Sequence, residues 1–130
     1  MADSSDKNIV LLQDNENQSA ITFKLRKGGV GNLKFKVTLY NNGEPNNNYT
    51  SSLISTTTWY KIKIKYDNVN NEWGWWIEDE LQDCGNGSEL GILEGDRRSG
   101  IQKWHFGFSN DNQEQPGTIY FDLINVKVNE

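Results

Sequence analysis

Hydrophobic and polar residues alternate along most of this chain, in runs separated by clusters of Asn, Gly, Asp and Ser. A period of two places successive side chains on opposite faces of a strand, whereas an amphipathic helix repeats about every 3.6 residues. The clearest alternating runs cover residues 32–40, 59–66 and 102–108. A fourth run, residues 117–128, is largely apolar on both faces, which is typical of a central strand. Helix signals are nearly absent, so the pattern predicts an all-β, antiparallel sandwich or barrel.

The segment from residue 59 to residue 78 is predicted to form a β-hairpin whose second strand contains three of the five tryptophans. Turn-forming residues separate its two alternating runs, so the loop centres on Val69 and Asn70. The cross-strand pairs are then Tyr66 with Trp73, Ile64 with Trp75, Ile62 with Ile77, Lys65 with Gly74, Lys63 with Trp76, and Lys61 with Glu78. A slip of one residue would set lysines against core tryptophans, at a cost of several kcal/mol. Trp73 and Trp75 are therefore predicted in the core, and Trp76 on the outer face.

The size and charge of the chain narrow the classes of protein to which it can belong. Its 130 residues fit a single domain, residues 1–130, with one core. A net charge of -5 and a pI near 4.9 argue against nucleic-acid binding, which favours a basic surface. No apolar run is long enough to span a bilayer, and the start MADSSDKN lacks the layout of a signal peptide. These features leave two alternatives, a cytosolic protein or the mature piece of an exported one.

Four segments in order resemble one known family. TTTWYKIKIKYD, then WWIED, IQKWHFGFSN and PGTIYFDLINVKV are similar to the laminin-G-like branch of the concanavalin A-like lectin and glucanase superfamily. The resemblance covers residues 54–128 well and the first half loosely. It implies a two-sheet jelly-roll sandwich, usually extracellular or at a cell surface, that binds carbohydrate or serves as an attachment module. The family's Asp-Gly turn is replaced by Glu78, Asp79 and Glu80, so a different turn is expected there.

The N-terminal half departs from the family pattern in one respect. Residues 9–29 resemble the family's second and third strands, so its first strand is either missing or supplied by another molecule. Strand supply between molecules would make the chain a structural or assembly protein, a homo-oligomer held through its sheet edges. This is the alternative to carbohydrate binding.

Catalytic chemistry is not expected. Glucan-hydrolysing members of the superfamily carry acids at alternate positions of one strand, whereas Glu78, Asp79 and Glu80 are consecutive and fall at a hairpin end. Cys84 and His105 could form a thiol–imidazole pair only if a third group oriented them, and neither lies in a recognisable nucleophile motif. Cys84 is the single cysteine, so an internal disulfide is excluded.

A structural calcium ion is left open, because many lectin-like sandwiches hold one and the chain is rich in Asp and Asn. The candidate ligands, Asp14, Asn15, Asp67 and Asp122, form no spaced motif such as an EF-hand loop. Asp122 is equally well placed as an acid of the final strand. No cofactor is expected.

The predicted ligand site is the outer face of the hairpin. An exposed aromatic ring beside hydrogen-bonding groups suits a sugar, which has apolar C–H faces and polar edges. The candidate residues are Trp76, Lys63, Lys61, Lys65 and Tyr40, with Lys36 and Lys34 beside Tyr40 if the strands share a sheet. The lysines suggest an acidic polysaccharide. The alternative is a solvated face on which lysine stems cover Trp76 and keep the strand soluble.

Two further segments bear on this expectation. Trp59 has outer-face parity but is expected to tuck under a loop as a structural residue. NNGEPNNN, residues 41–48, is predicted to be an Asn-rich loop. It and DCGNGSE, residues 83–89, are the next candidates for a binding site if the Trp76 face is not one. Taken together, the sequence predicts a non-catalytic, carbohydrate-binding or attachment module.

Overall fold

The computed structural model describes residues 4–14, 16, 18–28, 32–41, 44–93, 101, 103–106, 121 and 126. Within these residues the chain forms strands and no helix. The strands are β1 (Ser4–Gln13), β2 (Ser19–Gly28), β3 (Leu33–Asn41), β4 (Glu44–Leu53), β5 (Ile62–Asp67), β6 (Glu72–Ile77), β7 (Glu80–Leu81), β8 (Gly91–Ile92) and β9 (Lys103–Phe106). The predicted final strand, residues 117–128, lies outside the described residues except for Phe121 and Val126.

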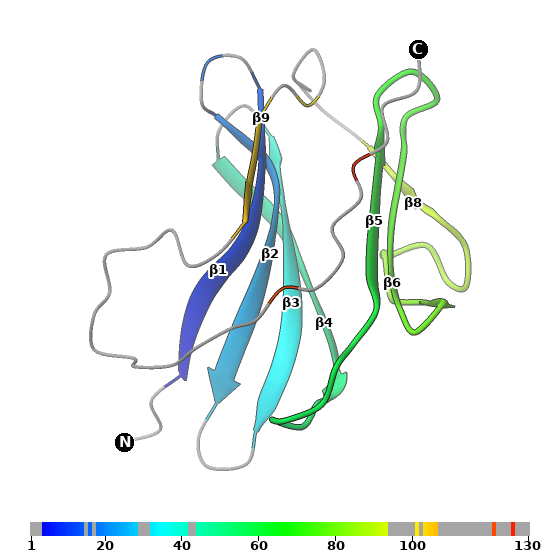
Figure 1. Ribbon diagram of the computed structural model, residues 1–130. Coiled ribbons are helices and arrows are strands. Elements are labelled where there is room, and N and C mark those ends of the chain that lie inside the picture. Colours follow the sequence, from blue (N-terminus) through cyan, green and yellow to red (C-terminus); the bar gives the residue numbers. More distant parts are fainter. Residues whose placement is uncertain are drawn as a thin grey trace.

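The strands form two antiparallel sheets that face one another (Figure 1). The five-stranded sheet has the order β4-β3-β2-β1-β9. The four-stranded sheet has the order β5-β6-β7, and β8 also pairs with β6. In Figure 1 strands β1 to β4 of the first sheet run from blue to teal and its β9 is gold, whereas the second sheet is green to yellow-green. The prediction of an all-β, antiparallel, sandwich-like architecture is therefore confirmed.

One hydrophobic core fills the space between the sheets. Its buried members are Ile9, Leu12, Ile21, Phe23, Phe35, Val37, Leu39, Trp73, Trp75, Cys84 and Leu93. Aromatic rings join the sheets directly: the Phe23 and Trp75 ring centroids are 6.2 Å apart, and those of Tyr49 and Trp73 are 5.4 Å apart. Apolar burial on this scale is the main favourable term in folding, so the two sheets stabilise each other.

β4 corrects the prediction of a loop at residues 41–48, because residues 44–48 form the first half of this strand. Asn is depleted in strands, and the composition therefore pointed to a loop. The segment nevertheless forms a strand, because its backbone pairs with the edge of β3 that β2 does not occupy. Where the β3–β4 register shifts, the Phe35 backbone N–H donates to Ser51 Oγ at 3.0 Å, which satisfies a buried donor.

The β5–β6 hairpin has the predicted register. All five pairs predicted within the strands, from Ile62 with Ile77 to Tyr66 with Trp73, are observed. Asp67 organises the turn: its Oδ1 accepts from the backbone N–H groups of Val69 and Asn70, each at 3.0 Å. Hydrogen bonds that the backbone N–H and the side-chain Nδ2 of Asn70 donate to Asp67 lower the pKa of the Asp67 carboxyl. The loop thus closes around Val69 and Asn70 as expected.

The turn between β6 and β7 is a two-residue hairpin without glycine. Ile77 pairs with Glu80, and the two residues between them, Glu78 and Asp79, have φ values of 51° and 64°. Positive φ at both central positions is the pattern of a type I′ turn, which favours Asn-Gly or Asp-Gly. The turn therefore differs from an Asp-Gly turn in its residues but has the backbone conformation that Asp-Gly favours. Because neither residue is glycine, this left-handed backbone is strained.

Asp79→Gly is expected to raise the free energy of unfolding by about 0.5–1 kcal/mol, because glycine adopts positive φ without steric cost. Urea denaturation of the two proteins measures the change. Asp79→Asn is the control, since Asn also tolerates positive φ while it removes the charge that pairs with Lys61. A loss of stability in both variants would mean that the ion pair outweighs the backbone strain.

Candidate functional site

Trp76 lies on the outer face of the four-stranded sheet, as predicted, and is half-buried. Trp73 and Trp75, its neighbours on β6, are 1% and 0% exposed and point into the core. Lys63, the cross-strand partner of Trp76, places its Nζ 4.1 Å from the centroid of the Trp76 ring. This is a cation–π contact, which orients the indole on the sheet surface.

Lys61 and Lys65, the other two lysines predicted on this face, pair with acidic side chains. Lys61 Nζ lies 2.9 Å from Asp79 Oδ1, and Lys65 Nζ lies 3.5 Å from Glu72 Oε2. The hydrogen bond and charge of Asp79 raise the pKa of Lys61. Carboxylates of the same sheet and its turn thus offset the charges of Lys61 and Lys65. The outer face of the hairpin does not carry the surplus of positive charge that the sequence suggested.

Gly74 leaves room for the Trp76 ring on the outer face of β6. A Cβ at this position would come 2.8 Å from Trp76 Cη2 and 2.7 Å from Leu90 Cδ2, closer than real Cβ contacts. The missing side chain therefore leaves room for the tip of the indole and for Leu90. The Gly between tryptophans in EWGWW is the sequence signal for this arrangement.

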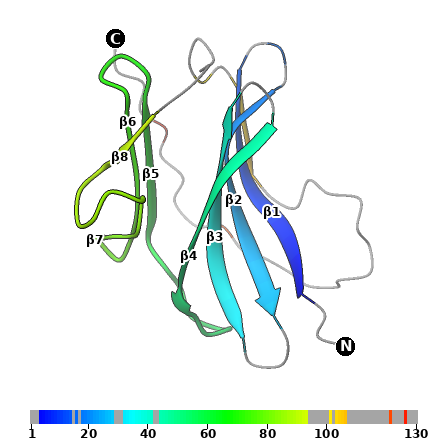
Figure 2. The same ribbon diagram turned by 180° about the vertical axis from the view of Figure 1, so that it is seen from behind.

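Beside Trp76 is an open hollow lined by residues of β6, β7, β8 and the loop at residues 82–90. Figure 2 shows this loop and β8 on the side of β6 away from the five-stranded sheet. We call this open hollow the Trp76 hollow. Its lining residues are Glu72, Trp76, Leu81, Asn86, Ser88, Glu89, Leu90, Gly91 and Ile92. Hydrogen bonds shape the loop, including Asn86 Nδ2 to the Leu90 carbonyl at 2.8 Å. The segment DCGNGSE, an alternative candidate from the sequence, thus lies next to the predicted aromatic residue.

The structure does not bring Tyr40 to this site, which corrects the prediction. Tyr40 belongs to β3, together with Lys34 and Lys36, and β3 is in the five-stranded sheet. Trp76 belongs to the other sheet, and the core lies between them. The alternation in the sequence indicated that both residues face outward but carried no information on which strands share a sheet.

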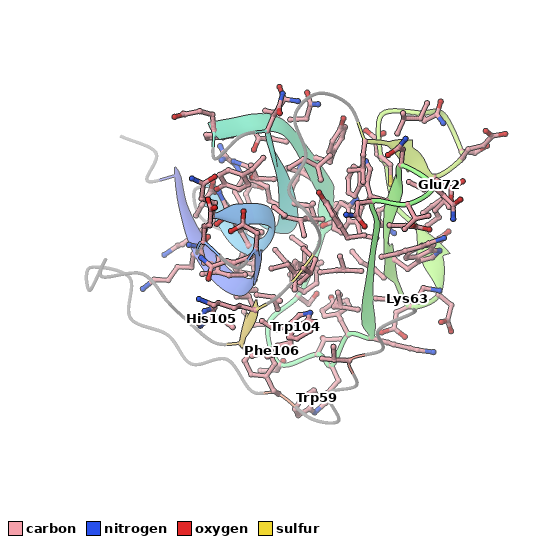
Figure 3. The ribbon with its side chains drawn as sticks, turned by 90° about the horizontal axis from the view of Figure 1, so that it is seen from above. Trp59, Lys63, Glu72, Trp104, His105 and Phe106 are labelled. Carbon is pink, nitrogen blue, oxygen red and sulfur yellow. The ribbon has the colours of Figure 1, made fainter. Side chains whose placement is uncertain are left out.

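Trp59 is a second correction. It precedes β5 and is 66% exposed, so it does not tuck under a loop. Tyr60, the next residue, takes the inner position instead, and its ring centroid lies 5.5 Å from that of Phe35. Figure 3 shows Trp59 apart from Lys63 and Glu72, which mark the outer face of the hairpin.

The acids considered for catalysis have structural contacts. Glu78 Oε1 accepts from the Lys61 backbone N–H at 2.5 Å, and Asp79 pairs with Lys61. Glu78 lies in the turn and Glu80 begins β7, so they do not project in step from one strand. They form part of an acidic, solvent-exposed turn.

Cys84 and His105 are on different sides of the fold. Cys84 is buried in the core, and burial raises the pKa of its thiol. His105 is exposed on β9, in the five-stranded sheet (Figure 3). A buried thiol with a raised pKa is a poor nucleophile, and this geometry offers it no imidazole base.

The described calcium candidates hold turns in place. Asp14 is 1% exposed, and its Oδ1 accepts from the backbone N–H groups of Glu16 and Gln18. Asp67 does the same in the hairpin loop. Asn15 and Asp122 lie outside the described residues. Among the residues that are described, no group of three or more His, Cys, Asp or Glu side chains is arranged to hold a metal.

The described part of the chain contains no helix with the length and hydropathy needed to cross a membrane. No protein-family model matches the chain, and comparisons with curated proteins and with solved structures find no significant match.

Proposed function

We propose that this chain is a non-catalytic carbohydrate-binding module and that the Trp76 hollow is its glycan site. The observation that carries the proposal is the half-buried indole of Trp76 beside an apolar wall, with carboxylate, amide and hydroxyl groups at the rim. The apolar wall consists of Leu81, Leu90 and Ile92, and the rim of Glu72, Asn86, Ser88 and Glu89. A pyranose presents apolar C–H faces and polar edges, which match such a surface.

The architecture supports this function as well. Two facing antiparallel sheets with one core are compatible with the concanavalin A-like jelly roll that the sequence resembles. We propose this finer fold, and with it an extracellular or cell-surface location. Sugar-binding sites on rigid sheets need little rearrangement when the ligand binds.

The charges around the hollow favour a neutral glycan over an acidic one. Glu72 and Glu89 line it. Lys65 is already paired with Glu72, and Lys63 is held over the Trp76 ring. An acidic sugar would approach two carboxylates with little compensation. Affinity at the hollow is therefore expected to change little with added salt.

Trp76→Ala is expected to weaken glycan binding at least about tenfold, because it removes the aromatic wall of the hollow. A panel of neutral and acidic polysaccharides in affinity electrophoresis measures the change. Trp59→Ala is the matched control, since Trp59 is exposed but lies outside the hollow. Binding that both variants retain would rule out the Trp76 hollow as the glycan site.

Assembly through sheet edges is the second candidate, and β4 is the edge that favours it. β4 spans 10 residues and, within the described residues, pairs only with β3. Pro45 and the register shift between Leu39 and Tyr40 work against it, because both hinder the addition of another strand. Size-exclusion mass at several protein concentrations separates the candidates: a mass that stays monomeric counts against assembly.

A further inference from the structure

Four basic side chains form a block on the outer face of the five-stranded sheet. Lys24 of β2 pairs directly with Lys36 of β3, and Arg26 of β2 pairs directly with Lys34 of β3. Residues that pair directly share a face, and Phe23 and Leu25, which alternate with them, point toward the core. The basic block therefore faces away from the core and from the Trp76 hollow.

This arrangement is unfavourable for the isolated protein. Like charges directly opposite one another destabilise a strand pair, and the basic block contains two such pairs in succession. Asp6 on β1 offsets part of the repulsion, because its carboxylate lies 3.1 Å from Arg26 Nη1 and 2.7 Å from Lys36 Nζ. Neither Lys24 nor Lys34 has an ion pair with a described residue. Four positive charges against one negative charge leave a surplus of three, in a chain whose net charge is -5.

A hollow adjoins the basic block. Arg26 and Lys34 line it together with Asn32, Thr50 and Leu53. Amide and hydroxyl groups thus stand beside the cations, where they can bind the uncharged oxygens of a ligand. The strand geometry spaces the cations by about 4.8 Å across the sheet and by about 6.8 Å along it. Such a grid suits a chain that carries an acidic group on each repeating unit.

We infer that this face is a second binding site, and that its ligand is a polyanionic glycan with carboxylate or sulfate groups. The choice of a glycan rests on the proposed function. An acidic protein partner is less well matched, because neither the basic block nor its hollow includes the aromatic side chains that anchor most protein interfaces. Single-stranded nucleic acid would also need aromatic stacking, and the net negative charge of the chain opposes it. Acidic polysaccharide, which the sequence suggested for the Trp76 face, is thus assigned to the opposite sheet.

Binding of heparin, polygalacturonate and neutral dextran to the full chain, measured by calorimetry at low and high ionic strength, tests the inference. We expect both polyanions to bind, to weaken with added salt and to raise the melting temperature, because they relieve the repulsion within the basic block. Lys24→Gln and Lys34→Gln should each weaken binding about threefold to fivefold, and the double variant at least about tenfold. Neither substitution removes an ion pair between described residues, so the variants should fold.

Lys27→Gln is the matched control. Lys27 lies on β2, as Lys24 does, and is exposed. Since it follows Arg26 directly, it belongs to the other face of the strand and not to the basic block. Equal weakening by Lys27→Gln and Lys34→Gln would show a diffuse charge effect and overturn the inference, as would no binding of either polyanion. Tighter binding of polyglutamate or single-stranded DNA would overturn the choice of a glycan. Loss of polyanion binding in Trp76→Ala, with the lysine variants unaffected, would move the acidic ligand to the Trp76 hollow and leave the proposed function standing.

Discussion

Trp75→Ala is expected to lower the free energy of unfolding by about 3–5 kcal/mol, the range for large-to-small substitution of a buried aromatic residue. The Trp75 side chain is 0% exposed, and its ring packs against that of Phe23 on the opposite sheet. The substitution also removes the hydrogen bond from Trp75 Nε1 to the Asp83 carbonyl at 2.9 Å. Trp73→Ala should cost a similar amount, since Trp73 is 1% exposed and packs against Tyr49. Denaturant midpoints measure both losses.

Trp76→Ala serves as the control on the same strand and should cost about 1 kcal/mol or less. Its ring lies on the outer face and is only half-buried, so little apolar surface returns to water. A loss as large as that of Trp75→Ala would show that the Trp76 indole is part of the core. Binding defects of Trp76→Ala could then no longer be separated from unfolding.

Gly91→Ala is expected to destabilise the fold by about 2–3 kcal/mol, because the new methyl group has no room. Gly91 pairs with Trp73 across β8 and β6, and a Cβ there would clash with Trp73 Nε1 and come 2.7 Å from Trp73 Cδ1 and Cε2. The indole cannot withdraw easily, since it is packed in the core against Tyr49. Thermal and denaturant unfolding measure the loss.

A double-mutant cycle with Trp73→Phe tests the cause of that loss. Phenylalanine lacks the indole nitrogen that the new methyl group would meet, so Gly91→Ala should cost clearly less in the Trp73→Phe background. Additive losses would contradict the clash, and would instead indicate a backbone requirement for glycine in β8.

The two proposed binding faces differ in how charges pair across their strands. On the hairpin, Lys61 and Lys65 meet Asp79 and Glu72, whereas on the other sheet basic residues meet basic residues. In the sequence alone, the alternating lysines of β5 and those of β3 form the same pattern. The register between strands, and not the composition of any single strand, decides on which face basic side chains lie opposite one another.

The sequence alone determined the local features of this protein. Alternation together with a loop rich in turn formers was enough to predict the β5–β6 register and the burial of Trp73 and Trp75, because a slip of one residue would bury lysines. The absence of helix signals likewise predicted an all-β, antiparallel fold, as observed in the described residues. These features depend on residues close in the chain, where periodicity carries the information.

The tertiary structure decided everything that depends on which strands become neighbours. In the folded chain an Asn-rich segment is part of β4, and Tyr40 and Trp76 lie on different sheets. Trp59 is exposed. The tertiary structure also set the loop at residues 82–90 beside Trp76 to form the hollow, and paired the basic residues of β2 and β3. The physical reason is that a strand pattern specifies an inner and an outer face but not a partner, and the partner is chosen by long-range packing and by the backbone hydrogen bonds that a free edge offers.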